Sequence, residues 1–165
     1  MLLSTKQIES VRAELKRQGV PLRIQTELGD AYGKISGNIF NIKMMLVNTI
    51  DSTHTYKDKT GTTHRGQHDT RKTLAHEYTH ILQVRKGFYF TSRSENEREL
   101  YNYNEIVANT IGMLCFPTEA NIIDNASYIN KYLSKGVGSL MKHLKDDIRV
   151  MLPEVKQFLK TTGLL

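Results

Sequence analysis

One stretch of the sequence decides the fold: residues 69–87, which read DTRKTLAHEYTHILQVRKG. Asp69 is a favourable N-cap, because its carboxylate can accept a hydrogen bond from the free backbone N–H groups of a first helical turn. Gly87 is the residue type that most often follows the end of a helix. The sequence therefore predicts a helix that begins after Asp69 and runs to about Lys86.

The middle of this helix carries an HExxH motif, formed by His76, Glu77, Tyr78, Thr79 and His80. Residues four apart lie one turn apart on the same helix face, so both imidazoles can reach a single Zn²⁺ ion. Glu77 lies beside the first ligand, where its carboxylate can take a proton from a zinc-bound water. The alternative is a helix that carries two ordinary, partly buried histidines.

A third ligand is needed, because catalytic zinc sites normally have three protein ligands and one open position. The metzincin pattern requires a histidine six residues after His80, and this chain has Lys86 there. The only later histidine is His143. We therefore expect a carboxylate from a second long helix, predicted over residues 100–116 and ended by the following proline.

Glu105 is the only acidic residue in that second helix. Ala108 and Gly112 share its face, and such small residues would let the two helices approach closely. Asn109, one turn further on, is a candidate for orienting a ligand. The alternative for Glu105 is a surface position on an amphipathic helix. The other nearby acids are expected to be solvated, in an exposed loop over residues 91–99 or beyond the helix: Glu95, Glu97, Glu99 and Glu119.

The chain before residue 69 changes its periodicity twice. Ser4 and Gln7 form a capping-box pattern for a first helix, which Gly19 and Pro21 end. Residues 22–48 alternate between apolar and polar side chains and predict two or three short antiparallel strands. Residues 51–68 predict a long surface hairpin or loop. Its three histidines have no helical spacing and are expected to be solvent-exposed rather than metal ligands: His54, His64 and His68.

Shorter helices are predicted after the second long helix, over residues 125–134, 139–152 and 153–160. The order of elements predicts an α+β fold, in which an N-terminal helix and a small antiparallel sheet precede the HExxH helix and a C-terminal helical bundle. The length of 165 residues fits a single domain over 1–165.

Composition narrows the functional classes. The chain has a net charge of +6, which is compatible with nucleic acid as a partner and excludes an acidic DNA mimic. Its single cysteine, Cys115, lies in an apolar run and is expected to be a buried hydrophobic residue rather than a catalytic thiol. Without a secretory signal or a membrane-spanning stretch, we expect a soluble, cytoplasmic protein.

The residues that follow the motif resemble known peptidases. Residues 103–109, YNEIVAN, look like the E-x-x-A-[NE] helix of zincin-like peptidases of the ImmA/IrrE type. Residues 125–133 and 144–149 resemble the C-terminal metallopeptidase domain of ArdC-type antirestriction proteins. The similarity covers about residues 70–162. It implies a gluzincin-like zinc site on a protein of a mobile element or phage, with His76, His80 and Glu105 as ligands and Glu77 as general base. ArdC-type proteins also carry an N-terminal single-stranded-DNA-binding domain, whereas we expect the residues before the motif in this sequence to form the sheet of the peptidase domain.

The leading hypothesis is a zinc-dependent metallopeptidase that hydrolyses a protein or peptide substrate, with Glu77 activating a zinc-bound water. The alternative is a zinc-stabilised module of the antirestriction type that binds DNA or protein with little turnover, suggested by the basic residues 131–160. A third hypothesis is a zinc enzyme that attacks another kind of bond. Three tyrosines are candidates to stabilise an oxyanion, and no spacing separates them: Tyr101, Tyr103 and Tyr128.

Overall fold

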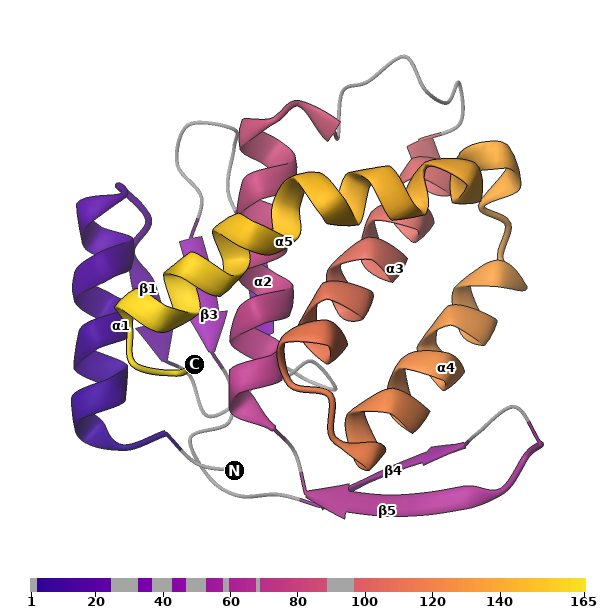
Figure 1. Cartoon of the computed structure of the whole chain (residues 1–165), viewed down its shortest axis with the longest axis horizontal. Coiled ribbons are helices and arrows are strands. Elements are labelled where there is room, and N and C mark those ends of the chain that lie inside the picture. Colours follow the sequence, from indigo (N-terminus) through magenta and orange to yellow (C-terminus); the bar gives the residue numbers. More distant parts are fainter. Residues whose placement is uncertain are drawn as a thin grey trace.

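The computed structural model describes residues 3–24, 33–36, 43–46, 53–57, 60–67, 69–88 and 97–165. These residues are mainly helical, and the elements are arranged around one central helix (Figure 1). That helix, α2 (Thr70–Arg85), carries the HExxH motif. The side chain of Asp69 accepts a hydrogen bond from the backbone N–H of Arg71, and Gly87 takes a positive φ of 74° after the last turn. Both predicted ends of this helix are confirmed.

Helix α3 (Glu97–Cys115) packs beside α2, and α4 (Glu119–Leu133) returns along α3. Both helices begin earlier than predicted. Residues 97–99 form the first turn of α3 rather than the end of a loop, and the rest of the predicted loop, residues 91–96, lies outside the described residues. Thr118 caps α4 by accepting from the backbone N–H of Asn121, so Glu119 lies in the first turn of a helix rather than outside one.

A single helix, α5 (Leu144–Thr161), replaces the two helices predicted over residues 139–160, and a short 3-10 helix, η2 (Gly138–His143), precedes it. Pro153 lies inside α5 instead of at the start of a new helix. Its missing N–H leaves the carbonyl of Arg149 without a helical donor, and Arg149 is exposed, where water can donate instead. In Figure 1, α5 crosses over α2 and α3.

The strands contradict the predicted α+β fold with one small antiparallel sheet. Three of them, β1 (Leu22–Ile24), β2 (Gly33–Ser36) and β3 (Lys43–Leu46), form a sheet of order β1-β3-β2 whose β1–β3 pair is parallel. The other two, β4 (Thr53–Lys57) and β5 (Thr63–Gln67), form a separate antiparallel ribbon. Alternating side chains identify strand residues but not their partners, so both the direction and the division into two sheets escaped the prediction. The ribbon confirms the predicted hairpin.

The core lies where α2, α3 and α5 meet. Helix α1 (Thr5–Arg17) covers one side of it, and its capping box between Ser4 and Gln7 is confirmed. Cys115 is buried, as predicted, and burial raises the pKa of its thiol to about 11. Fully buried apolar side chains come from all four helices: Leu15, Leu74, Ile81, Ile106, Ile111, Met151 and Leu159.

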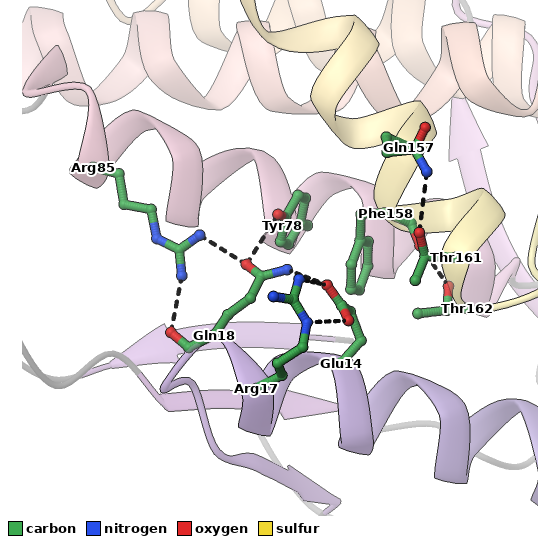
Figure 2. A network of polar contacts seen from close by, with 9 residues as sticks. All are labelled: Glu14, Arg17, Gln18, Tyr78, Arg85, Gln157, Phe158, Thr161 and Thr162. Carbon is green, nitrogen blue, oxygen red and sulfur yellow. Dashed lines mark hydrogen bonds and ion pairs between the residues drawn. The ribbon is translucent and has the colours of Figure 1, made fainter.

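A network of polar and aromatic contacts holds α2, through Tyr78 and Arg85, against the end of α1 and against α5 (Figure 2). The Tyr78 hydroxyl donates to Gln18 Oε1 over 3.0 Å, and Arg85 donates to the same oxygen and to the Gln18 carbonyl. The Tyr78 ring stacks on Phe158 of α5, with 4.0 Å between the ring centroids. Tyr78 lies inside the HExxH motif, so this network fixes the helix that carries the two histidines.

Among the described residues, none of the helices combines the length and apolar composition that crossing a membrane requires.

Candidate metal centre

Three predicted ligands meet between α2 and α3. His76 and His80 place their Nε2 atoms 3.1 Å apart on one face of α2. Glu105 of α3 approaches both, with Oε1 3.0 Å from His80 Nε2 and Oε2 3.4 Å from His76 Nε2. His80 and Glu105 are buried, and His76 is partly so. This cluster of two imidazoles and one carboxylate could hold a metal ion.

The spacing suits a small tetrahedral ion. Two ligand atoms bound about 2.05 Å from one ion at the tetrahedral angle lie about 3.3 Å from each other. The three separations in the cluster, between 3.0 and 3.4 Å, are close to that value. The donor set of nitrogen and oxygen is also one that zinc accepts, so the residues fit this metal in both chemistry and spacing.

Close packing of α3 against α2 places the carboxylate. A Cβ atom added to Gly112 would lie 3.1 Å from the carbonyl oxygen of Lys72, so a larger residue would require that backbone to move by a few tenths of an ångström. Ala108, between Gly112 and Glu105, is fully buried. The prediction that small residues let the two helices approach closely is therefore confirmed.

Gln83 orients one of the histidines and was not predicted. Its Oε1 atom lies 2.7 Å from His80 Nδ1 and accepts a hydrogen bond from that nitrogen, so that Nε2 is the nitrogen that faces Glu105. The Gln83 amide nitrogen donates to the carbonyl of Asn104 on α3 over 3.0 Å. The sequence does carry one indication of this contact: Gln83 follows His80 by three residues, which places both on one helix face.

Tyr128 of α4 orients the carboxylate. Its hydroxyl donates to Glu105 Oε2 over 2.5 Å, and its ring stands edge-on to His76 with centroids 6.1 Å apart. The three tyrosines that the sequence named as oxyanion candidates differ in their contacts, and which of them stabilises an oxyanion stays a prediction. Tyr103 donates to Asp147 of α5 instead. Tyr101 is 51% exposed beside the cluster, and burial together with the charge of Glu105 raises its pKa to about 12.

Asn109 does not orient a ligand in the predicted way. Its amide donates to Asn125 Oδ1 on α4 over 2.8 Å, and so helps to hold α4 against α3. The sequence placed Asn109 on the correct face but could not show that α4 would supply a partner there.

The charges in the cluster depend on one another. Burial alone would raise the pKa of Glu105, but hydrogen bonds and charge from His76 and His80 outweigh it and hold that pKa well below its ordinary value. Burial opposes protonation of His80, but the hydrogen bond and charge of Glu105 raise its pKa to about 9. Glu105 is thus ionised and available as a ligand, and a metal must displace a proton from His80 to bind.

Glu77 lies next to the cluster without joining it. Its Oε1 atom is 4.0 Å from His76 Nε2, and the residue is buried. Burial raises the pKa of its carboxyl group, and the neighbouring histidines only partly oppose this. A carboxylate with a raised pKa is a stronger proton acceptor, which is the property that a general base needs.

The structure describes the backbone of three of the four remaining histidines. His54 and His64 belong to β4 and β5 of the ribbon, and His143 ends η2. The predicted exposure of His54 and His64 concerns side chains that lie outside the described part of the chain. His68 lies wholly outside the described residues.

No protein-family model matches this chain, and neither the curated proteins nor the solved structures include a significant match to it.

Proposed function

We propose that the protein is a zinc-dependent metallopeptidase that hydrolyses peptide bonds in a protein or peptide substrate. The observation that carries this proposal is the spacing of His76, His80 and Glu105, whose ligand atoms all lie within 4.8 Å of one another. The position of Glu77 beside them supplies the general base that hydrolysis requires. The resemblance to zincin-like peptidases of mobile elements supports the same proposal and suggests such an element or a phage as the origin.

A zinc ion held by these three residues would polarise a scissile carbonyl and make water a stronger nucleophile at neutral pH. The protein's own groups divide the remaining work. Glu77 accepts the proton of the attacking water and later donates it to the leaving amine. Gln83 and Tyr128 hold His80 and Glu105 in the orientations that binding requires.

The decisive experiment separates metal binding from catalysis. We expect about one zinc ion per chain after extensive dialysis of the wild-type protein, by elemental analysis, and clearly less in Glu105→Ala. Glu77→Gln should keep its zinc, because Glu77 is not a ligand, and should lose hydrolysis of a casein or peptide-library substrate. Cleavage by Glu77→Gln at the wild-type rate would refute the mechanism, and a wild-type protein that retains no zinc would refute the site itself.

A further inference from the structure

Helices α3 and α4 run antiparallel in a register that leads away from the candidate metal centre. Asn109 bonds to Asn125, and Glu105 bonds to Tyr128 one turn along. The next pair in this register is Tyr101 with Tyr132, which is consistent with the influence of Tyr132 on the pKa of Tyr101. The row of residues paired between α3 and α4 therefore continues from the candidate metal ligands toward the N-terminal end of α3.

Two lysines lie beside this row of paired residues. Lys131 Nζ lies 6.0 Å from the centroid of the Tyr128 ring and 5.3 Å from that of Tyr132, and Lys135 Nζ lies 5.4 Å from the Tyr132 ring. Both lysines are exposed, and the described residues place no carboxylate within ion-pair distance of either. We call the five residues Tyr101, Tyr128, Lys131, Tyr132 and Lys135 the basic tyrosine strip.

We infer that the basic tyrosine strip binds an acidic side chain of the peptide substrate, about two to three residues from the scissile bond. This inference rests on the proposed function. Along the axis of α4, the backbones of Lys131 and Lys135 lie about 4.5 and 10.5 Å beyond that of Tyr128, at about 1.5 Å per residue. An extended peptide advances about 3.3 Å per residue, so a carboxylate two to three residues beyond a point level with Tyr128 is level with the stretch of chain between the two lysines.

The strip suits a peptide better than a nucleic acid. Binding of single strands relies on open aromatic faces on which bases stack. Of the tyrosines in the strip, Tyr101 alone is exposed, at 51%, whereas Tyr132 is only 8% exposed and lysine ammonium groups lie over the rings of Tyr128 and Tyr132. A carboxylate needs only the ammonium groups, which remain exposed.

The test measures binding rather than turnover. The probes are fluorescein-labelled pentapeptide hydroxamates, whose hydroxamate binds zinc, with Asp or Asn at the second or third residue from that group. Fluorescence anisotropy with the zinc-loaded, full-length protein should show the Asp peptide binding about five-fold tighter at low salt. That ratio should shrink as salt rises.

Lys131→Glu should bring the ratio of the two affinities to about one. The matched control is Lys6→Glu, which makes the same charge change at an exposed lysine of α1, at the opposite end of the molecule from α4 in Figure 1. This control should keep the wild-type ratio.

Each outcome has a distinct meaning. Equal affinity of the Asp and Asn peptides for the wild-type protein overturns this inference and leaves the metal site intact. Binding of neither peptide to protein that holds zinc overturns the proposed function together with the inference. If a thymidine dodecamer displaces the peptides from the wild-type protein but not from Lys131→Glu, the strip is a nucleic-acid site and the inference is also wrong.

Discussion

Tyr128 and Gln83 show what single residues add to a motif. The sequence provided both histidines, Glu77 and Glu105, because helical spacing and the lack of any other acid in residues 100–116 could be seen directly. It named Tyr128 only as one of three candidates to stabilise an oxyanion, and could not show its contact with Glu105, which lies 23 residues earlier on a separate helix. Contacts between helices depend on how the helices pack, and no local pattern of residues reports that.

At the same scale, Tyr128→Phe should weaken zinc binding by about ten-fold or more, because the Glu105 carboxylate loses the hydrogen bond that orients it. Competition with a chromophoric chelator would measure the affinity. Tyr103→Phe is the matched control, since it deletes the same hydroxyl from a contact with α5 that lies outside the cluster. If the two variants bound zinc equally well, Tyr128 would have no orienting role.

Helices were easier to predict than strands. The ends of α2 were predicted from Asp69 and Gly87, because caps are local chemistry. The sheet was predicted wrongly, since the pairing of β1 with β3 joins segments that are not neighbours in the chain. The start of α4 at Glu119 was missed although Thr118 is a good N-cap, because Pro117 was read as an end rather than as the approach to a new helix.

Packing between elements leads to a prediction at Gly112. Gly112→Val should lower the free energy of unfolding by about 1–3 kcal/mol, because the added carbons would press on the Lys72 backbone and push α3 away from α2. Urea denaturation measures this. The control is Leu114→Val, which introduces the same branched side chain at an exposed position of α3 and should change stability by less than about 0.5 kcal/mol. Equal losses in both variants would mean that the contact between residue 112 and the Lys72 backbone does not account for the effect.

For the molecule as a whole, the candidate ligands come from two helices that both contribute to the core. A ligand that binds only the folded state stabilises it, by about 2.7 kcal/mol at a free concentration of 100 times its Kd. The metal site and the fold should therefore be lost together.

Removing the metal should accordingly lower the melting temperature. We expect excess EDTA to lower the Tm of the zinc-loaded protein by about 5–10 °C, measured by circular dichroism. Glu105→Ala should melt at the same temperature with and without the chelator. A wild-type Tm that EDTA leaves unchanged would show that these three groups take up no stabilising ion.

The two unspecified positions of the HExxH motif, Tyr78 and Thr79, have a consequence for protein design. Tyr78 bonds to Gln18 and stacks on Phe158, and the buried Thr79 hydroxyl donates to the carbonyl of Ala75. Neither position is a neutral spacer, although a motif written as HExxH leaves both unspecified. A designer who transplants this turn into another scaffold would preserve the spacing of the imidazoles but lose the contacts of Tyr78 with Gln18 and Phe158. The graft would therefore also need a neighbouring helix behind Tyr78 and a second one that supplies the carboxylate.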